Sequence, residues 1–228
     1  PNLAQVPSGS EYRKLFHPGE GRVQVGADAS GLELRCLAHY LSRFDGGKFG
    51  KEVIDGDIHT VLSEIYGTDR KTGKSVTYCL IYGGGNQKLG LTAGASKKDA
   101  AKKGKEIREA YVNAIPGLKE LLQAVHKASE RGYVRGLDGR HIGVDKGHKA
   151  LNYLIQGSAA TLAKRWMVLA NEHSPETARQ VAFVHDELQY ECKEEDKEDA
   201  SKEEEAPKKK TRRGRKKKEP AKDEVSKS

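Results

Sequence analysis

Two aspartates stand where predicted strands end or turn, and their placement suggests metal-assisted chemistry. Asp28 closes the segment RVQVGAD, in which Val23 and Val25 alternate with polar residues as in a strand. Asp186 lies in AFVHDELQY, where three polar residues interrupt two apolar runs. If the two strands are neighbours, the carboxylates converge, and oxygen ligands of this kind favour Mg²⁺. Two such ions about 3.5–4 Å apart catalyse phosphoryl transfer. The plainer interpretation of either aspartate is a turn or cap residue.

A helix predicted across RKTGKSVTYCLIYG places two cations and two aromatic residues on one stripe. Arg70, Lys74, Tyr78 and Tyr82 follow each other every four residues. Such a surface suits a polyphosphate followed by a sugar and a base, although a solvated basic turn leading into a packed aromatic face has the same spacing. TGKS is not part of a P-loop, because that motif requires Gly at position 68, where the chain has Thr.

A third set of candidates lies on the predicted helix KALNYLIQGSAATLAKRWM. His148, Asn152 and Gln156 again recur every fourth residue. Amides can donate to the minor-groove acceptors N3 and O2, which every base pair presents, so they can test pair geometry without reading sequence. The alternative interpretation is ordinary surface amides.

Strands and helices that would position these residues follow from periodicity and turn residues. Ser30 is expected to cap a helix over SGLELRCLAHYLSRF, and Gly83 to Gly85 are expected to stop the helix that carries Lys74. Residues 96–131 predict two helices with a break at Pro116 and Gly117.

Residues 133–192 predict two hairpins joined by a helix. Asp138 and Gly139, between alternating residues, indicate a hairpin turn of the primed kind. A helix follows over residues 149–172, and then strands near 180–184 and 188–192, with His185, Asp186 and Glu187 as the turn between them.

Charge is distributed unevenly along the 228 residues. The net charge of +8 equals that of residues 206–228 alone, which hold eleven Lys and Arg against three Asp and Glu. From residue 193 on, large apolar residues almost disappear, so a disordered tail is predicted. The tail suits a flexible phosphate-binding arm whose contribution weakens with salt. A nuclear-import signal or a solubilising segment fits the same composition.

Other features of the composition exclude several classes of protein. Cys36, Cys79 and Cys192 are widely spaced without a CxxC motif, so buried free thiols in a reducing compartment are expected rather than disulfides or zinc ligands. No apolar run approaches the length of a membrane span, and the N-terminal PNLAQVPSGS lacks the pattern of a signal peptide. We therefore expect a soluble intracellular protein without a membrane partner.

Four separated patches together resemble the signature motifs of family-A DNA polymerases, the bacterial polymerase I and phage replicase group. They are DASGLELR (28–35), RxxxKxxxY with YGGG (70–85), LNYLIQGSAA (151–160) and VHDE (184–187). The similarity extends from Pro1, where PNLAQVPS resembles a segment preceding the first motif, to about Cys192. Agreement in order and spacing outweighs the separate plainer interpretations.

The resemblance implies an α+β fold with an antiparallel palm sheet and a mostly helical fingers subdomain, a right-hand polymerase fold without its thumb. Residues 1–20 would be a lead-in. The palm would take residues 21–66 and 133–192, with a catalytic motif in each part. The fingers would take residues 67–132, and residues 193–228 would form the disordered charged tail.

By the resemblance, two Mg²⁺ ions are the cofactors. Asp28 and Asp186 would bind them with the backbone carbonyl of Ala29, and Glu187 would lie beside this catalytic pair. Lys74 would hold the triphosphate and protonate the leaving pyrophosphate.

The substrate implied is a dNTP, because Glu33 would close off the space of a ribose 2′-OH. His59 in GDIHT would hold the triphosphate with Arg70. Tyr78 would pack on the incoming sugar and base. Family members with Tyr at this place tolerate dideoxynucleotides.

Primer-template DNA is the implied macromolecular partner. The residues expected to contact the DNA lie in the family motifs or near them. They are Tyr82, Gly83, Arg140, His148, Asn152, Gln156 and His185.

Two alternatives belong to other classes. Single-subunit RNA polymerases share the palm, but VHDE and Glu33 both favour DNA synthesis. A degenerate DNA-binding relic without catalysis would keep the motifs and bind through its tail.

The thumb, the first part of the palm and the exonuclease domain of the family have no counterpart in these residues, so a second polypeptide carrying thumb and exonuclease is expected as a partner. The resemblance to phage replicases indicates the cytoplasm of an infected cell, or its nucleoid, as the location, with nuclear import through the basic tail as an alternative.

Overall fold

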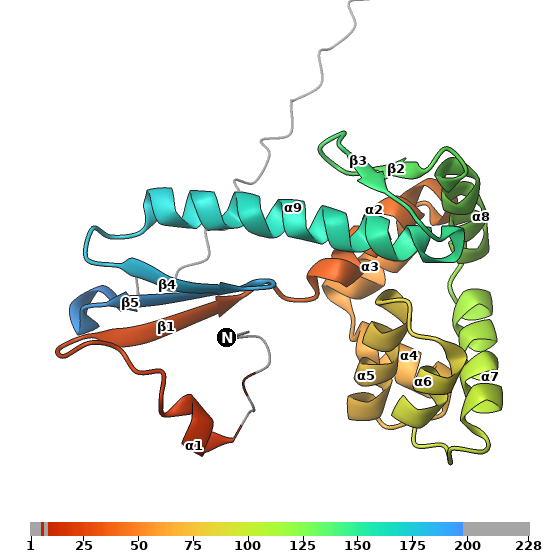
Figure 1. Cartoon of the computed structure of the whole chain (residues 1–228), viewed down its shortest axis with the longest axis horizontal. Helices are drawn as coiled ribbons and strands as arrows, with labels where there is room; N and C mark the ends of the chain where they lie inside the picture. Colours follow the sequence, from red (N-terminus) through yellow and green to blue (C-terminus); the bar gives the residue numbers. More distant parts are fainter. Residues whose placement is uncertain (1–5, 7–8, 198–228) are drawn as a thin grey trace, which may run out of the picture.

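The computed structural model describes residue 6 and residues 9–197, which form a mixed α+β fold dominated by helices (Figure 1). The α-helices are α1 (Ser10–Arg13), α2 (Leu32–Asp45), α3 (Lys48–Asp55), α4 (Ile58–Tyr66), α5 (Arg70–Ile81), α6 (Asn86–Thr92), α7 (Ala100–Ala114), α8 (Leu118–Ser129) and α9 (Ala150–His173). The strands are β1 (Val23–Asp28), β2 (Tyr133–Arg135), β3 (His141–Gly143), β4 (Arg179–Val184) and β5 (Glu187–Cys192), and the 3₁₀-helices are η2 (Gly147–Lys149) and η3 (Glu194–Asp196).

An antiparallel three-stranded sheet with the order β1-β5-β4 holds the two ends of the described chain together. Its central strand β5 alternates partly buried and buried residues, as expected when one face of a sheet is covered. Leu188, Tyr190 and Cys192 point to the buried face, and Val25 of β1 pairs with Tyr190 on that face. The polar face carries the Gln24–Gln189 hydrogen bond.

Helix α9 connects the sheet to the rest of the molecule. It runs alongside the sheet and reaches α2 and α8 at its other end (Figure 1). The buried residues of α9 cluster in its N-terminal part, between Ala150 and Ala163. Since the core around α2, α8 and α9 also contacts Phe183 of β4, one hydrophobic core reaches from the helices to the sheet.

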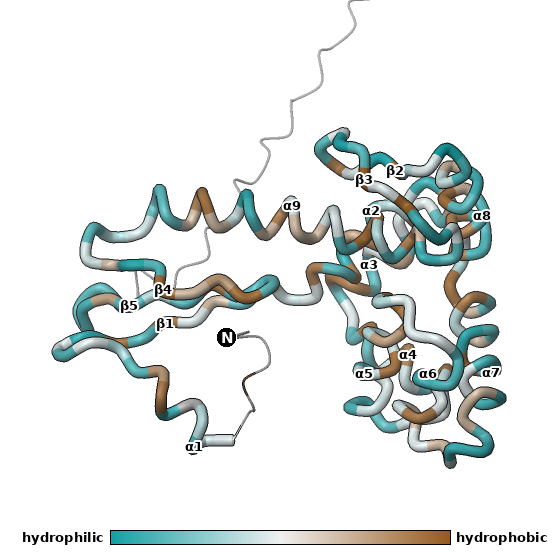
Figure 2. Tube along the Cα trace, in the orientation of Figure 1, coloured by the Kyte–Doolittle hydropathy of each residue, from teal (hydrophilic) through white to brown (hydrophobic). Residues whose placement is uncertain are grey.

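Helices α4 to α7 form a group on the side of α2 that is away from β2 and β3 (Figure 1). Hydrophobic positions alternate with hydrophilic ones along their backbones, as in amphipathic helices (Figure 2). Two glycines permit the close helix pairs: a Cβ at Gly73 of α5 would overlap Ser63 of α4, and one at Gly104 of α7 would overlap the Asn86 carbonyl of α6. Helices α4 and α5 both contribute residues to a cavity at the end of the three-stranded sheet.

Most predicted elements are found, and the structure differs from the prediction in five local details. Ser30 does not cap α2, whose N-cap is Gly31 in a left-handed conformation without a side-chain bond. The lead-in contains α1. Helices α3, α4 and α6 were not predicted, and α4 starts inside GDIHT.

The other two corrections concern a turn and the tail. The β2–β3 loop is not a primed two-residue turn: Gly136 N–H donates to the Arg140 carbonyl and Gly139 N–H to the Gly136 carbonyl, and only Gly139 has positive φ. This is the three-residue loop that ends in a left-handed glycine. Residues 193–197 are ordered through η3, and Thr177 donates a hydrogen bond to Asp196. The predicted disorder of residues 198–228 lies outside the described residues.

Two predictions from composition can be compared with the structure. The three cysteines are free and buried, as predicted. Over the part of the chain that the structure describes, no helix has the length and apolarity that crossing a bilayer requires.

Candidate active site

Backbone hydrogen bonds bring Asp28 and Asp186 to the same end of the sheet. Asp28 is the last residue of β1 and pairs with Glu187, the first residue of β5. Val184 also pairs with Glu187, so His185 and Asp186 form a two-residue loop. The N–H of Ala29 donates to the Asp186 carbonyl over 2.9 Å, which ties the two carboxylate-bearing segments directly together.

Glu187 therefore belongs to a strand, and the predicted three-residue turn is wrong in this detail. Its side chain accepts a hydrogen bond from Gln189, two residues along β5. His185 has φ of 58°, the one positive φ of a non-glycine residue among those described. This conformation is uncommon, although His is among the residues in which it is enriched. This tight loop places Asp186 beside the end of β1, where Asp28 lies.

Charge and partial burial make the carboxylate pair unfavourable without a cation. Burial raises the pKa of Asp28, the Asp186 charge raises it further, and the Lys74 ammonium lowers it. Burial is also the main cause of the raised pKa of Asp186, to which the charges of Glu33 and Glu187 add. Raised pKa values of this origin mean that the two carboxylates gain from a bound cation.

The donor set fits Mg²⁺ better than zinc. In the described residues, His, Cys, Asp and Glu side chains nowhere gather in a group of three or more that could enclose a metal ion. Mg²⁺ typically binds one or two carboxylates and completes its shell with water and substrate phosphates. Asp28 and Asp186, with the backbone of Ala29 beside them, match that requirement.

The carboxylates open into a cavity of about 630 Å³ between the sheet end, α2, α4 and α5. Its lining combines acids of the strand end and of α2 with cations of α5, and Asp57 lies beside Arg70 among them. Its lining residues are Asp28, Ser30, Gly31, Glu33, Leu34, Arg35, Val53, Gly56, Asp57, Ile58, His59, Arg70, Lys74, Tyr78, Tyr82 and Asp186. This cleft brings together eight of the predicted site residues from four segments that are distant in the sequence.

Helix α5 contributes the stripe that the four-residue spacing predicts. Lys74 Nζ lies 6.0 Å from the centre of the Tyr78 ring, and the Tyr78 and Tyr82 rings stack at a centroid distance of 6.0 Å. Asp69 starts the helix, since its carboxylate accepts hydrogen bonds from the N–H groups of Lys71 and Thr72. The stripe is therefore a continuous wall that changes from cationic to aromatic.

Glu33 of α2 faces the aromatic end of this wall. The Tyr82 hydroxyl donates to Glu33 Oε1 over 2.7 Å, so the glutamate is placed by a side chain that lies 49 positions away in the sequence. Burial raises the pKa of Tyr82, and the hydrogen bond to Glu33 raises it further. Tyr82 is thus a neutral donor that holds Glu33 at the cleft.

His59 approaches the cleft from α4. Its ring centre lies 6.1 Å from that of Tyr78. Burial lowers the pKa of His59, and the charges of Lys74 and Arg70 lower it further. Its Nδ1 is buried and has no hydrogen-bond partner among the described residues. Near neutral pH the ring is therefore mainly uncharged.

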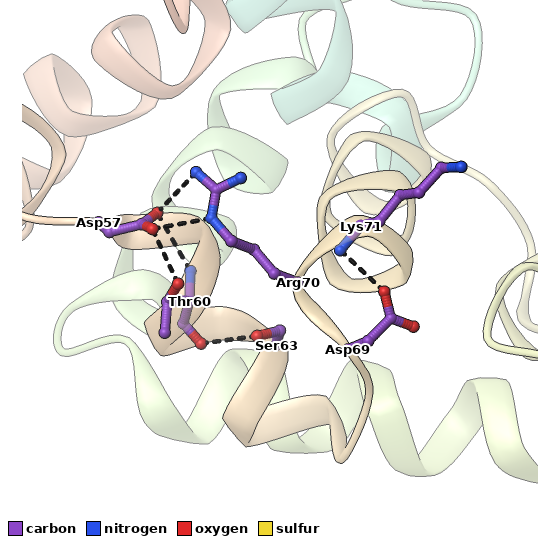
Figure 3. Close-up of polar contacts among 6 residues, drawn as sticks. All are labelled: Asp57, Thr60, Ser63, Asp69, Arg70 and Lys71. Carbon is purple, nitrogen blue, oxygen red and sulfur yellow. Dashed lines mark hydrogen bonds and ion pairs between the residues drawn. The ribbon is translucent and has the colours of Figure 1, made fainter.

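Arg70 forms an ion pair that the sequence did not reveal. Its Nε and Nη2 donate to the two carboxylate oxygens of Asp57 over 2.8 and 3.2 Å (Figure 3). Arg70 and Asp57 both line the cleft. GDIHT pointed to His59 alone, although an Asp just before a helix is a common N-cap and was a usable signal for Asp57.

The residues predicted to contact primer and template are more dispersed. Asn152 donates to the Ile81 carbonyl over 2.6 Å and lies against Gly83, which has φ of 70°. Gln156 is exposed on α9. Except for Tyr82, none of this set lines the cleft.

Two of them lie in other elements. His148 is in η2 rather than on α9, so the predicted helical stripe applies only to Asn152 and Gln156. Arg140 closes the β2–β3 loop and is bonded to Asp138 through Nε over 2.5 Å. Periodicity alone could not show that a 3₁₀ turn precedes α9 and takes His148 out of the helical stripe.

The fold and the cleft define a mixed α+β protein with an acidic strand end facing a cationic and aromatic helix. The family model described as DNA polymerase family A matches residues 1–212, and the chain belongs to that family. The match extends beyond Cys192, where the similarity was expected to end.

Several curated polymerases are similar to the chain over most of its length. The DNA-directed DNA polymerases of Escherichia phage T7 and Enterobacteria phage T3 are each 33% identical over 86% of this chain and 33% of their own length. DNA polymerase I of Bacillus caldotenax is 31% identical over 87% of this chain and 25% of its own. The chain thus spans about a third or less of these relatives.

A solved structure shows the same arrangement of elements. The POL domain of Pol1 from M. smegmatis, in complex with DNA primer-template and dNTP, is matched with a TM-score of 0.67 and 27% identity. The match covers 88% of this chain and 40% of that one. The mixed fold is therefore that of a polymerase I polymerase domain.

Proposed function

We propose that residues 1–228 form the catalytic part of a template-directed DNA polymerase, which adds dNMP to a primer 3′-OH. The observation that carries this proposal is the convergence of Asp28 and Asp186 opposite Arg70 and Lys74 in one cleft. A cleft that holds both a carboxylate pair and cations suits a reaction that brings a metal-bound triphosphate to an attacking hydroxyl.

Asp28, Asp186 and the carbonyl of Ala29 would hold two Mg²⁺ ions. When bound, such ions lower the pKa of an attacking oxygen and neutralise charge on the leaving one. The protein contributes the fixed spacing of the two carboxylates, which the β1–β5 pairing and the Ala29–Asp186 hydrogen bond set. Glu187 adds negative charge beside the pair.

The cationic end of α5 would bind the triphosphate. Arg70 can bind two phosphate oxygens at once through its planar guanidinium, and Lys74 acts as a mobile point charge. Lys74 is near enough to Asp28 to lower its pKa, and its Nζ lies 6.0 Å from the centre of the Tyr78 ring. From this position an ammonium could give a proton to the leaving pyrophosphate. His59 would add a neutral imidazole contact.

The aromatic end would take the sugar and base. Tyr78 offers a ring face, and Glu33, held by Tyr82, would fill the volume of a ribose 2′-OH and so select dNTPs. Tyr82 and Gly83 would border the templating base. Arg140, His148, Asn152, Gln156 and His185 would contact primer and template around the cleft.

In the language of the right-hand fold, we assign the palm to residues 21–66 and 133–192, and the fingers to residues 67–132. Supporting observations are the sheet that carries both aspartates and helix α5, which lines the same cleft. We place the enzyme in the cytoplasm or nucleoid of a phage-infected cell, on the strength of the T7 and T3 relatives.

Primer extension tests the catalytic proposal. Asp28→Ala and Asp186→Ala should each lower extension by at least about 10³-fold, equivalent to ~4 kcal/mol of transition-state stabilisation, while primer-template binding measured by fluorescence anisotropy is retained. Asp69→Ala, at an acid that starts α5 outside the cleft lining, is the matched control. Equal activity of the Asp186 variant and the wild type would contradict the proposal.

We further propose that a second polypeptide carrying thumb and exonuclease grips the duplex. The support is that the similar polymerases are at least three times as long as the matched region. Co-purification from the source cell followed by a processivity assay tests it. Robust processive synthesis by the isolated chain, or a thumb within the same polypeptide, would contradict it.

The alternative function is a non-catalytic DNA-binding relic. It would be supported by DNA binding without extension under any condition, either alone or with a partner fraction.

A further inference from the structure

Asp57 stands at the mouth of the cleft and bonds to Arg70 with two oxygens. Arg70 Nε meets Asp57 Oδ2 at 2.8 Å and Nη2 meets Oδ1 at 3.2 Å (Figure 3). The pair is bidentate, which fixes the plane of the guanidinium as well as its position. Hydrogen bonds to Arg70 hold the pKa of Asp57 well below its ordinary value, so the carboxylate is charged at every relevant pH.

The same carboxylate also caps α4. Asp57 Oδ1 accepts from the Thr60 N–H over 3.3 Å, and Oδ2 accepts from the Thr60 hydroxyl over 2.8 Å (Figure 3). Helix α4 carries His59 two positions after the cap. One side chain therefore connects two residues of the proposed triphosphate site, His59 through its helix and Arg70 directly.

The geometry leaves part of the guanidinium available to a ligand. Arginine has five N–H donors, and Asp57 uses one on Nε and one on Nη2. No other hydrogen bond of this group is found within residues 9–197. The Nη1 edge can thus bind a phosphate oxygen while the opposite edge stays on Asp57.

We infer that Asp57 is a positioning residue for the triphosphate: it holds Arg70 in a single orientation before the nucleotide arrives. This role rests on the proposed polymerase function. Asp57 also repels a polyanion, but the Arg70 and Asp57 side chains are 59% and 48% exposed, so water and salt weaken the repulsion. Fixing a long, flexible side chain in advance then outweighs it.

The expected effect is on nucleotide binding rather than on chemistry. Asp57→Asn keeps an N-cap acceptor, because Asn caps helices about as well as Asp, but loses the charged bidentate pair. The KM for dNTP should rise about 2- to 10-fold, the range that ordering one long side chain contributes to binding. The kcat should change less than about twofold. A lower KM would show that Asp57 competes with the nucleotide and would overturn the inference.

A double-mutant cycle separates positioning from a general structural effect. If Asp57 acts through Arg70, adding Asp57→Asn to Arg70→Ala should leave the KM of the single Arg70 variant unchanged. Additive effects would overturn the inference. Asp69→Asn is the matched control, since among the described residues Asp69 accepts hydrogen bonds from the N–H groups of Lys71 and Thr72 and forms none with the Arg70 side chain. Its KM should equal that of the wild type.

Direct titration of dATP and of deoxyadenosine, measured by calorimetry, distinguishes this inference from the catalytic proposal. Asp57→Asn should weaken binding of dATP and leave that of deoxyadenosine unchanged, because only the former carries phosphates. If the wild type extends primers, and Asp57→Asn has the same KM for dNTP and the same affinity for dATP as the wild type, the positioning role fails alone. If the wild type extends nothing but shows the dATP difference, the catalytic proposal fails alone. If dATP binds to neither protein, the positioning role fails, and primer extension by the wild type decides the catalytic proposal.

Discussion

The two walls of the cleft hold their functional groups by different means. On the strand wall, backbone hydrogen bonds set Asp28 and Asp186: the β1–β5 pairing and the bond from Ala29 to the Asp186 carbonyl. On the helix wall, side chains hold side chains, as in Arg70 with Asp57 and Tyr82 with Glu33. The strand wall therefore has little freedom, whereas the groups of the helix wall are each held by one or two side-chain contacts.

The difference follows from electrostatics. The two carboxylates repel each other, so only a rigid backbone can keep them together in the absence of a cation. The helix wall has complementary charges, which find each other without such constraint. Variants should consequently differ in kind: changes in the core beneath the strand wall should destabilise the fold, whereas changes in the side chains of the helix wall should act mainly on ligands.

The largest effect is expected from weakening the core beneath the strand wall. Leu188 is 0% exposed and lies between Ala27 and Phe183 in the sheet register. Leu188→Ala should lower the free energy of unfolding by about 2–5 kcal/mol, through lost burial and the cavity left behind. Urea denaturation followed by circular dichroism measures it. Val181→Ala, at an edge-strand residue 44% exposed, is the control and should change little.

Next in size is the removal of a helix-wall cation. Lys74→Ala should lower kcat about 10²-fold, equivalent to ~2.7 kcal/mol, because a positioned proton donor contributes at least that factor. The melting temperature should stay near that of the wild type, since Lys74 is exposed. Lys71→Ala, on the same helix but absent from the cleft lining, should have normal kinetics. Large destabilisation by Lys74→Ala would contradict the contrast between the walls.

Neutralising Asp186 at the strand end and Asp69 at the start of α5 should change stability in opposite directions. The folded-state pKa of Asp186 is raised above 3.8, so its ionisation costs stability as pH rises through that pKa, and Asp186→Asn should raise the melting temperature at pH 7. Hydrogen bonds lower the pKa of Asp69, so its charge stabilises the fold above pH 3.8 and Asp69→Asn should lower the melting temperature. The Asp186 difference should shrink as pH falls through its raised pKa towards 3.8, whereas the Asp69 difference should persist down to pH 3.8 and be lost only below it, as pH falls through the lowered pKa.

Thermal melts with added Mg²⁺ extend this comparison. The ion should raise the melting temperature of the wild type more than that of Asp186→Asn, because the variant has lost a ligand. An equal rise in both proteins would argue against the carboxylate pair as the metal site.

Local patterns predicted the strand wall and the stripe on α5. Strand alternation up to Asp28, two apolar runs around Asp186 and the four-residue spacing from Arg70 are all properties of short segments. Helix α3 was missed because it has only eight residues, of which Phe49 alone is buried, so it gives a short signal between two glycine-containing segments. The Arg70–Asp57 pair spans 13 positions and depends on the packing of α4 against Gly73, so no local signal encodes it.

Turns and caps were the other source of error, because several residue types serve them equally well. Gly31 takes the N-cap of α2 in place of Ser30, and the loop before Arg140 has three residues rather than two. Both choices are decided by how flanking elements meet. The resemblance to the polymerase motifs supplied the remaining site predictions, such as the role of Glu33, which no pattern in the chain establishes by itself.

The smallest effect is expected from a single contact in the helix wall. Tyr82→Phe removes the hydroxyl that donates to Glu33 over 2.7 Å and keeps the ring that stacks on Tyr78. An exposed neutral–charged hydrogen bond is worth about 1 kcal/mol, so dNTP incorporation should fall only a few-fold while discrimination against rNTPs weakens, because Glu33 is then free to move. Competition between dNTP and rNTP in primer extension measures this ratio. Tyr153→Phe, which removes a hydroxyl bonded to Asp145 outside the cleft, should leave the ratio unchanged. A Tyr82→Phe enzyme with unaltered discrimination would show that Glu33 is held by its own helix, and that side-chain contacts matter less to the helix wall than the comparison of the two walls implies.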